Sequence, residues 1–360
     1  MIFVLLTMKI AVLVSGGVDS SVALRLLKDA GHEVHAFYLK IWLEDDVAFL
    51  GECPWEEDLG YVIGVCDSLG VPFVVVPLQK EYYARIVSYT LESVRKGLTP
   101  NPDVLCNQQI KFGAFFDAID SSFEKIASGH YAQVELVNGV YRLKRAPDLV
   151  KDQTYFLSLL SQEQLSRALF PIGHMVKHEV RHLAADFNLP NKDRKDSQGI
   201  CFLGKISFDK FIEHHVGVWL GDIVDVGSGD VIGRHRGFYF YTIGQRKGLD
   251  LSGGPWYVVG KDSSKNIVHV AHAYSDFASG RDSFDVSLIQ WNGIRPVSGF
   301  LGVRIRHVGK IYDAEVALSD DGVSAHVVLP EADHGVTPGQ FAVFYGGSNY
   351  QYCLGGGTIV

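Results

Sequence analysis

The first half of the chain alternates short apolar runs with segments in which apolar residues recur every three or four positions. Lys9 to Val14 is such a run and predicts a buried strand, and the segment from Val22 to Ala30, which stops at Gly31, predicts a helix. Strands that alternate with helices are typical of a parallel sheet with crossover helices. The same alternation predicts further strands at residues 33–39, 73–76 and 125–128 and further helices at residues 58–69, 82–96 and 107–119.

A hairpin signal interrupts this rhythm after the fourth predicted strand. Apolar residues alternate between residues 133 and 142 around Asn138-Gly139, a dipeptide that favours the tight turn of a two-stranded hairpin. Helical spacing then returns, because Ser161 and Gln164 are spaced as a capping box and residues 177–187 are amphipathic. We therefore expect the first domain to continue past this hairpin.

From Val216 onward the helix signals stop. Short β-branched and aromatic runs alternate there with glycine turns such as residues 227–230 and 253–255, a pattern typical of all-β domains. The sequence contains no internal repeat. It predicts a multidomain α/β plus β protein with a parallel-sheet domain at residues 1–215, a small central β-rich domain at residues 216–281 and a C-terminal β-barrel at residues 282–360.

The composition is that of an ordinary globular protein. Of the 360 residues, 47% are hydrophobic and 21% are charged, which gives no sign of disorder. The apolar stretch from Met1 to Thr7 is too short to cross a bilayer and is soon followed by Lys9, so we expect a cytoplasmic protein without a membrane partner. Five cysteines without a Cys-x-x-Cys pair argue against a disulfide framework and against a structural zinc site.

The net charge of −8 argues against a nucleic-acid partner, because such binding depends largely on neutralising phosphates. Local basic clusters weaken this objection. Each cluster alone is typical of a solvated face, but all of them lie after residue 140, and together they suggest one basic face. The clusters are Arg142, Lys144, Arg145 and Lys151; Lys192, Arg194 and Lys195; Arg234, Arg236, Arg246 and Lys247; and Arg304, Arg306 and Lys310.

A glycine loop, Ser15-Gly16-Gly17-Val18-Asp19-Ser20-Ser21, follows the first predicted strand directly and leads into the first predicted helix. Glycines let backbone N–H groups approach an anion, and the helix N-terminus adds about half a positive charge at the same place, so the loop predicts a phosphate site. The kinase-type loop is excluded, because Asp19 stands where a lysine would be expected. An acidic residue there suits a magnesium ion or the orientation of a leaving pyrophosphate. A glycine turn without a ligand is the alternative.

Two further sequence blocks narrow the range of possible functions. They are Asn101-Pro102-Asp103-Val104-Leu105-Cys106-Asn107 and Asp196-Ser197-Gln198-Gly199-Ile200-Cys201-Phe202. Together with the glycine loop, which resembles the pyrophosphatase loop of ATP-dependent adenylating enzymes, they resemble the tRNA-specific 2-thiouridylases. That family replaces the 2-oxygen of the wobble uridine with sulfur in certain tRNAs. The resemblance extends over nearly the whole chain and includes residues 111–113, 129–131, 151–153 and 353–357.

The resemblance implies an ATP-pyrophosphatase domain of the adenine nucleotide alpha hydrolase type, a small central β domain and a C-terminal barrel that contacts tRNA. It implies ATP as a cofactor, and the acidic residue of the loop adds Mg²⁺ at Asp19 to this expectation. As partners it implies a persulfide sulfur donor protein and the tRNAs for Lys, Glu and Gln. It implies that Cys106 is the nucleophile, that Cys201 carries the persulfide and that Asp103 acts as general acid or base. The residues implied to bind ATP are Gly16, Gly17, Val18, Asp19, Ser20, Ser21, Leu39 and Gly129, and those implied to bind tRNA are Asn101, Pro102, Asp103, His130, Lys151, Asp152, Gln153, Arg306, His307 and Gln340.

One departure affects a single contact, since residue 307 is histidine where the family usually has an aromatic phenol. The chemistry of thiolation nevertheless accounts for the two cysteines. A uridine carbonyl oxygen is a poor leaving group, so adenylation must precede its replacement. Either the Cys201 persulfide attacks the activated carbon and Cys106 then forms a disulfide with Cys201, or Cys106 attacks the persulfide first and liberates hydrosulfide. The sequence leaves both orders open.

A reactive cysteine needs an environment that favours its thiolate. Cys106 directly precedes the helix predicted from Asn107, whose N-terminus would provide this, and Cys201 lies in a glycine-flanked loop. Asp103 also fits a cap of that helix, and Lys151 and Gln153 also fit plain surface positions. A lone cysteine is usually a small buried hydrophobe, which is our expectation for the cysteines outside the motifs, Cys53, Cys66 and Cys353.

Two rival functions share some of these features. An ATP-pyrophosphatase ligase that amidates a small carboxylate would use the same loop, but it would need neither the two motif cysteines nor the β-rich last third. A non-catalytic RNA-binding protein with a degenerate nucleotide site is the other rival, and the intact glycine loop argues against it.

Overall fold

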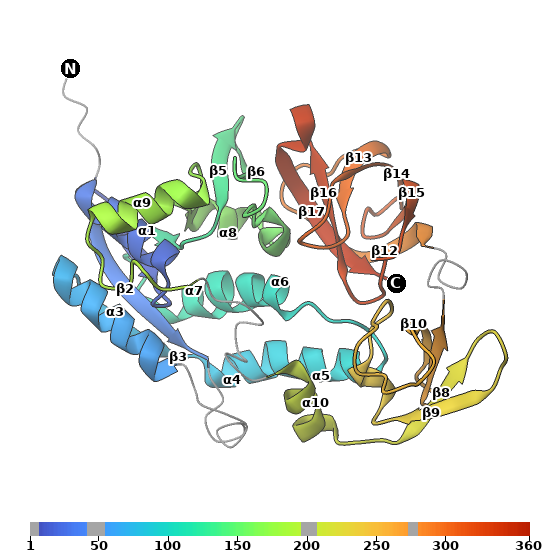
Figure 1. The fold of residues 1–360 in the computed structure, drawn as a ribbon. Coiled ribbons are helices and arrows are strands. Elements are labelled where there is room, and N and C mark those ends of the chain that lie inside the picture. The colour runs from blue at the N-terminus through green and yellow to red at the C-terminus, as the bar shows by residue number, and fades with distance from the viewer. Residues whose placement is uncertain (1–6, 42–54, 196–206, 273–279) are drawn as a thin grey trace.

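A parallel sheet of five strands forms the centre of the N-terminal part of the chain (Figure 1). The computed structural model describes residues 7–41, 55–195, 207–272 and 280–360. All neighbouring strands of this sheet are parallel, in the order β3-β2-β1-β4-β7. Because the chain order reverses between β1 and β4, their carboxyl ends flank the switch point at which open α/β sheets bind ligands. The strands are β1 (Lys9–Leu13), β2 (Glu33–Lys40), β3 (Phe73–Pro77), β4 (Lys125–Ala127) and β7 (Ala168–Leu169).

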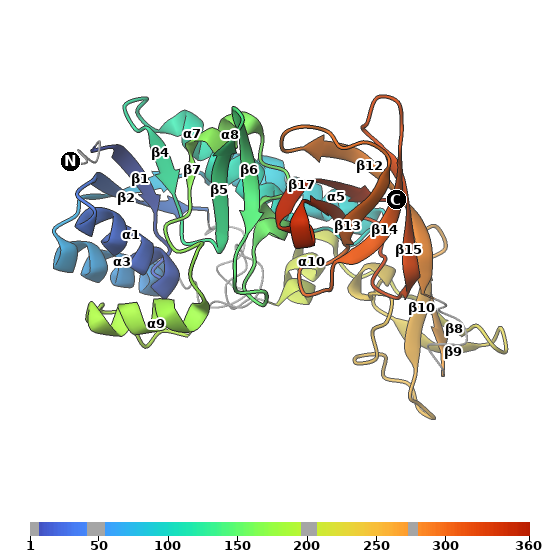
Figure 2. The same ribbon diagram turned by 90° about the horizontal axis from the view of Figure 1, so that it is seen from above.

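Helices cover both faces of this sheet (Figures 1 and 2). Alternate residues of β1 explain why, since Ile10 and Val12 pack into one apolar cluster with helix residues Leu24 and Val65, whereas Leu13 packs into another on the opposite face. Two π-helical segments, Tyr83–Val87 and Asn107–Ala114, link α4 to α5 and α6 to α7. The helices are α1 (Val18–Asp29), α3 (Trp55–Leu69), α4 (Gln79–Tyr82), α5 (Ser88–Arg95), α6 (Pro102–Cys106), α7 (Phe115–Ala118), α8 (Gln162–Arg167) and α9 (Lys177–Asp186).

The predicted elements of this domain are confirmed, and their boundaries shift. The capping box is present at the start of α8, where the Ser161 hydroxyl accepts from the Gln164 N–H and the Gln164 side chain accepts from the Ser161 N–H. The helix predicted from Val22 begins earlier, at Val18, so the second half of the glycine motif is already helical. The helix predicted from Asn107 also begins earlier, at Pro102, which changes the surroundings of Cys106.

The predicted hairpin connects two domains. Strands β5 (Ala132–Val137) and β6 (Val140–Arg145) meet at a turn in which Asn138 and Gly139 have φ of 53° and 79°, as the Asn-Gly signal predicted. Strand β6 then pairs with the last strand of the barrel, β17 (Tyr352–Ile359), through the partners Leu143 and Cys353. The N-terminal domain and the barrel therefore share one continuous sheet.

The C-terminal part is a closed barrel, because the strand order β12-β15-β14-β13-β16-β17 is completed by pairing of β12 with β17. Buried and exposed residues alternate along β14, which places Ala314 and Val316 inside, as a barrel requires. The strands that precede β17 are β12 (Arg281–Trp291), β13 (Gly299–Arg304), β14 (Tyr312–Leu318), β15 (Ala325–Asp333) and β16 (Phe341–Gly346).

The central part is β-rich and joins the N-terminal domain through α10 (Phe208–Val216), where the Arg95 guanidinium donates to the His215 carbonyl oxygen at 3.3 Å. Its residues Val258 and Val268 belong to the same apolar cluster as the helices on one face of the parallel sheet. Within the described ranges, no helix is long and apolar enough to cross a membrane. The central strands are β8 (Gly221–Asp225), β9 (Val231–His235), β10 (Tyr257–Asp262) and β11 (Ile267–Ala271).

Candidate functional site

The glycine loop lies between the end of β1 and the first turn of α1, at the switch point of the sheet. Gly16 adopts a φ of +71°, which favours glycine, and the Ser20 hydroxyl closes the loop by accepting from the Ser15 N–H at 3.3 Å and donating to the Gly17 carbonyl at 2.9 Å. Among the described residues, no side chain caps the start of α1. Its first N–H groups therefore remain available for an anion.

Two glycines of the predicted nucleotide site are required by close packing. A Cβ on Gly16 would lie 2.6 Å from the Asp58 carbonyl oxygen and 2.7 Å from Nη1 of Arg194. A Cβ on Gly129, which follows β4, would lie 2.6 Å from the Ser20 backbone nitrogen. Leu39 lies near the carboxyl end of β2 and is half-buried. The structure thus brings the loop, Leu39 and Gly129 to one edge of the sheet.

Asp19 is held by two groups that sequence motifs did not reveal. The Lys177 ammonium lies 2.8 and 2.9 Å from the two Asp19 carboxylate oxygens, and the Tyr131 hydroxyl donates to Oδ1 at 2.9 Å. In the described part of the chain no group of three or more His, Cys, Asp or Glu residues could hold a metal ion. Magnesium at Asp19 would therefore need nucleotide phosphates as further ligands, which is how proteins often bind it.

The segment after α9 folds back onto the glycine loop. Asn191 is 1% exposed and donates through Nδ2 to the Gly16 carbonyl at 2.7 Å and to the Ser21 hydroxyl at 2.9 Å. Its Oδ1 has no hydrogen-bond partner within the described ranges. Arg194 forms an ion pair with Asp58 through Nη2, whereas its buried Nη1 has no partner in the described part of the chain. Burial raises the pKa of Asp58, and Arg194 acts in the opposite direction.

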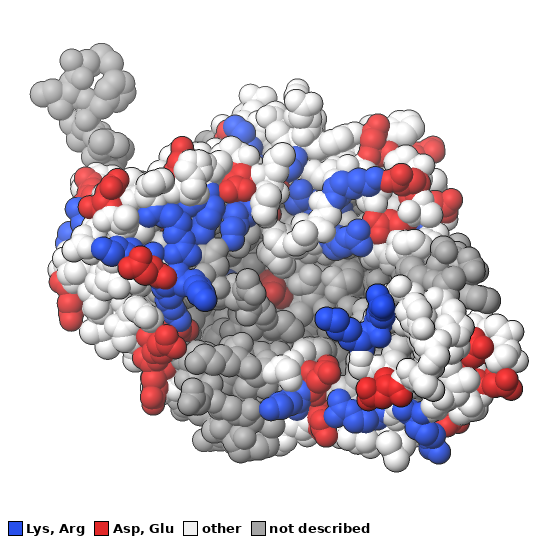
Figure 3. All heavy atoms as spheres, in the orientation of Figure 1, with Lys and Arg blue, Asp and Glu red and all other residues white. Residues whose placement is uncertain are grey.

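These features fit a triphosphate. The loop offers a helix start without a side-chain cap and glycine at each close approach, and Arg194 adds a buried guanidinium N–H that lacks an acceptor among the described residues. The sequence identified the basic cluster that contains Arg194, but it gave no sign that this cluster returns to the loop. Figure 3 shows Lys and Arg side chains gathered over α9 and the segment that follows it.

The structure corrects the prediction for Cys106. Helix α6 begins at Pro102, so Cys106 lies beyond its first turn and not before a helix N-terminus. The side chain is 1% exposed, and burial raises the pKa of its thiol to about 11, although Lys111 acts in the opposite direction. The expectation that a helix N-terminus favours the thiolate is therefore wrong. Asp103 lies in the first turn, one position beyond the start, so it is not the cap.

Residues predicted to line the tRNA site meet at the junction of the N-terminal domain and the barrel. Asn101 donates through Nδ2 to Oε1 of Gln340 at 3.3 Å, and Gln340 donates to the Thr99 carbonyl at 3.1 Å. The His307 ring lies 4.3 Å from the Phe156 ring, and burial lowers the pKa of His307. Pro102 is buried at the start of α6. Four of the predicted residues therefore lie around the start of the Cys106 helix.

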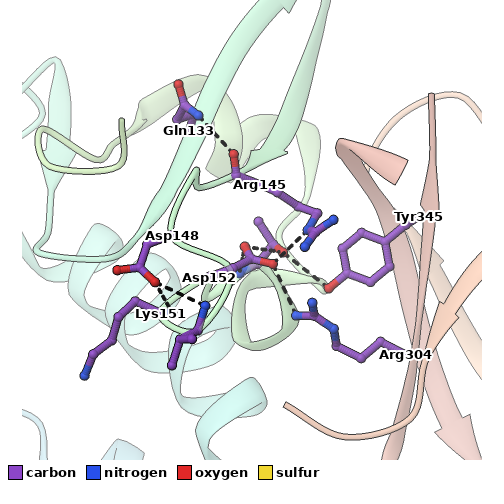
Figure 4. Close-up of polar contacts among 9 residues, drawn as sticks. Gln133, Arg145, Asp148, Lys151, Asp152, Arg304 and Tyr345 are labelled. Carbon is purple, nitrogen blue, oxygen red and sulfur yellow. Dashed lines mark hydrogen bonds and ion pairs between the residues drawn. The ribbon is translucent and has the colours of Figure 1, made fainter. Parts of the chain in front are cut away.

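Asp152 is buried between the two domains (Figure 4). Its carboxylate lies 3.0 Å from Nε of Arg145 and 3.2 Å from Nη1 of Arg304, and it accepts from the Thr154 hydroxyl at 2.9 Å. Its side chain is 0% exposed. Arg145 and Arg304 are thus interior ion-pair partners and not members of the predicted basic face. A contact between Asp152 and tRNA stays a prediction and would need this junction to open.

Lys151 and Gln153, the sequence neighbours of Asp152, also form hydrogen bonds within the protein. The Gln153 side chain accepts from the Tyr131 N–H at 2.9 Å, and the Lys151 N–H donates to an Asp148 oxygen at 3.1 Å. Both side chains are partly buried. Their contacts with tRNA stay predictions.

Two further predicted tRNA contacts differ in exposure. His130 is 9% exposed, packs beside the rings of Phe112 and Phe170, and places Nδ1 2.7 Å from the Ser128 hydroxyl. Burial holds the pKa of His130 well below its usual value, so the ring is neutral. Arg306 is half exposed and is paired with Asp333 at 3.2 Å. Of these two, Arg306 presents a charge to solvent.

Of the remaining four cysteines, two lie among the described residues and two lie outside them. Cys66 and Cys353 are buried, in agreement with the small hydrophobes predicted. Cys53 and Cys201, with the Asp196–Phe202 block, lie outside the described residues, so the structure does not place the predicted persulfide.

Three family profiles match the chain in succession. They are described as a tRNA methyl transferase HUP domain at residues 8–205, a tRNA methyl transferase PRC-barrel domain at residues 209–272 and an aminomethyltransferase beta-barrel domain at residues 281–359. These descriptions agree with a parallel-sheet domain, a central β-rich domain and a closed barrel, so the predicted fold class is confirmed.

Curated relatives match over nearly the full length. A protein of Parabacteroides distasonis and one of Porphyromonas gingivalis, both named tRNA-specific 2-thiouridylase MnmA, are each 43% identical over 98% of this chain and 99% of their own. A solved NMN synthetase from Francisella tularensis superposes with a TM-score of 0.35 and 16% identity, over 57% of this chain and 71% of its own. The two 43% identical relatives confirm the resemblance seen in the motifs, and the chain belongs to the family of tRNA-specific 2-thiouridylases.

Proposed function

We propose that this protein replaces the 2-oxygen of the wobble uridine of tRNA with sulfur, using ATP and a cysteine persulfide. The observation that carries the proposal is an intact nucleotide loop at the β1–β4 switch point in a chain 43% identical to relatives named tRNA-specific 2-thiouridylase. The loop would bind the phosphates of ATP, Leu39 and Gly129 would contact the adenine, and Asp19 would hold a magnesium ion, which would offset phosphate charge. The substrates are tRNAs for Lys, Glu and Gln, and the sulfur comes from a persulfide donor protein in the cytoplasm.

Each of the three parts of the chain has its own role in this proposal. Residues 1–215 activate the base, residues 216–281 support that domain through the shared apolar cluster, and residues 282–360 contact tRNA. The target uridine would enter at the junction where Asn101 and Gln340 meet, close to Cys106. Asp103 would act there as general acid or base.

The reaction balances with the residues at hand. The uridine O2 attacks the α-phosphorus of ATP and releases pyrophosphate, which leaves C2 activated by AMP. The terminal sulfur of the Cys201 persulfide attacks C2 and expels AMP. The Cys106 thiolate then attacks the Cys201 sulfur, which breaks the S–S bond, leaves the transferred sulfur on the base and forms a Cys106–Cys201 disulfide. A cellular dithiol supplies the electrons and protons that regenerate both thiols.

The alternative order uses the same atoms. The Cys106 thiolate attacks the persulfide first, the two cysteines form the disulfide, and the released hydrosulfide attacks C2 and expels AMP. In both orders Cys106 must lose its proton. Its thiol is buried and has a pKa of about 11 in this structure, so the reacting state requires a rearrangement that exposes it or brings a base to it.

The test is substitution of the two cysteines in the full-length protein. Cys106→Ser and Cys201→Ser should each abolish 2-thiouridine formation, measured by mass spectrometry of nucleosides from reacted tRNA, while ATP binding stays near normal. Cys66→Ser is the control, since Cys66 is buried in the core and outside both motifs. Full thiolation by either motif variant would contradict the two-thiol scheme.

Pyrophosphate release separates the rival functions. Thiolation predicts release from ATP that depends on added tRNA. Release that needs a small carboxylate and ignores tRNA would favour the amidating ligase, and no release under either condition would leave a non-catalytic RNA-binding protein.

A further inference from the structure

Two cations outside the glycine motif converge on the nucleotide loop. Lys177 comes from the first residue of α9, and Arg194 from the segment after that helix. The buried residue Asn191 fixes the same segment to the loop through the Gly16 carbonyl and the Ser21 hydroxyl. Residues from distant parts of the sequence therefore pack against the loop, and the two of them that carry a charge, Lys177 and Arg194, are positive.

The Arg194 guanidinium lies next to Gly16 of the loop and has one donor, Nη1, that Asp58 does not occupy. Its Nη1 would lie 2.7 Å from a Cβ on Gly16, is buried and has no hydrogen-bond partner among the described residues, whereas Nη2 is taken by Asp58. The guanidinium is also held in place by the Tyr61 ring, 4.7 Å from its centre. A buried guanidinium N–H without an acceptor is costly, which indicates that a ligand supplies the acceptor.

Lys177 occupies an unfavourable place for a cation in its own helix, because the N-terminus of α9 carries the positive end of the dipole. Its ammonium bridges both carboxylate oxygens of Asp19, at 2.8 and 2.9 Å, in the first turn of α1. It therefore stands where the N-terminus of α1 attracts an anion. A phosphate oxygen bound there would be a further acceptor for the Lys177 ammonium.

We propose that Arg194 and Lys177 bind the β- and γ-phosphates of ATP and so distinguish the triphosphate from AMP. This inference rests on the proposed function, because it assigns residues to the ATP of that reaction. Together the two side chains would favour ATP over the AMP product and hold the pyrophosphate in position as it leaves. The recognition is charge-assisted, and for Arg194 it uses a planar donor that suits phosphate.

The test compares nucleotide affinities of full-length variants by calorimetry. The ligands are AMP and a non-cleavable ATP analogue with a methylene bridge between the α- and β-phosphates, each with magnesium. Arg194→Met and Lys177→Met should each weaken binding of the ATP analogue by roughly 10- to 100-fold and leave AMP affinity within about twofold of wild type. Lys192→Met is the matched control, because the Lys192 ammonium binds Asn188 and should affect neither ligand.

The outcomes separate this inference from the proposed function. Equal weakening of both ligands by Arg194→Met and Lys177→Met would assign these residues a structural role and overturn the inference. Wild-type protein that prefers the ATP analogue, with variants that keep this preference, would overturn the inference and leave the proposed function standing. Wild-type protein without any preference for the triphosphate would overturn both.

Discussion

Substitution of Asp152 by asparagine tests whether the junction between the N-terminal domain and the barrel depends on one buried charge. The carboxylate is 0% exposed and faces Arg145 and Arg304, whose side chains are 15% and 5% exposed. Asparagine keeps the oxygen that accepts from Thr154 but removes the negative charge. The two guanidinium groups are then left in the interior without compensation.

The expected loss is large. Removal of one partner from a buried ion pair typically lowers the free energy of unfolding by about 3–5 kcal/mol, because the other charge stays desolvated and unpaired. Adding Arg304→Met to Asp152→Asn removes one of the two orphaned charges and keeps an aliphatic side chain in its place. The double variant should therefore be more stable than the sum of the single effects, by about 1–3 kcal/mol.

The assay is urea unfolding of full-length protein, combined with hydrogen exchange at β6 and β17, because a chain of several domains need not unfold in one step. Faster exchange should appear first at Leu143 and Cys353, where the two strands pair. Asp29→Asn is the control, since it breaks an exposed pair with Arg25 that is worth at most about 0.5 kcal/mol.

One result would refute this reasoning. If Asp152→Asn unfolded within about 1 kcal/mol of wild type and lost tRNA affinity, Asp152 would act as an RNA contact, as the family resemblance implies, and not as an interior tie between domains.

Three further predictions follow from single residues. Gly129→Ala should lower the free energy of unfolding by about 1–3 kcal/mol and weaken ATP binding, because the added Cβ would meet the Ser20 nitrogen. Gly60→Ala is the matched control: Gly60 has open space around it in α3, so this variant should raise the free energy of unfolding by about 0.5–1 kcal/mol in the same assay. Burial holds the pKa of His130 well below its usual value. As the pH falls, His130 therefore takes up a proton near pH 6.5 in the unfolded chain, before it does so in the folded protein. The free energy of unfolding should then decrease as the pH falls below about 6.5. His130→Gln should flatten this loss in urea titrations between about pH 5 and 7, and an unchanged slope would contradict the assignment. Cys106 should react slowly with iodoacetamide at neutral pH and faster once tRNA and ATP are added, as measured by peptide mass spectrometry, and fast labelling of the free protein would contradict its burial.

Local signals in the sequence predicted the α/β order well, because each depends on neighbours along the chain. The apolar run of β1, the capping box of α8 and the Asn138-Gly139 turn all appear where their patterns placed them. The start of the Cys106 helix was missed although Asn101-Pro102 is itself a helix-start signal, with a good capping residue followed by proline at the first helical position.

Contacts between distant segments could not be predicted in the same way. Nothing in β6 indicates that it pairs with β17, since an edge strand can accept any partner of suitable register. The return of Asn191 and Arg194 to the glycine loop is also set by tertiary packing of α9 against α1, so the sequence showed only a basic cluster. The burial of Asp152 is not visible in the sequence for a similar reason, because it depends on arginines from two domains.

Asp148 gives the nucleotide loop and the predicted tRNA turn a common anchor. One carboxylate oxygen accepts from the Lys177 N–H at 2.9 Å, and the other accepts from the N–H groups of Val150 and Lys151 at 3.1 Å. Lys177 in turn reaches Asp19, so four hydrogen-bonded residues connect the start of α1 with the turn that precedes Asp152. The Asp148 carboxylate thus contacts both segments, and Asp152, which follows the turn, is paired with Arg304 of the barrel. Under the proposed function, these contacts would connect the ATP loop with the tRNA junction without contact between the two ligands.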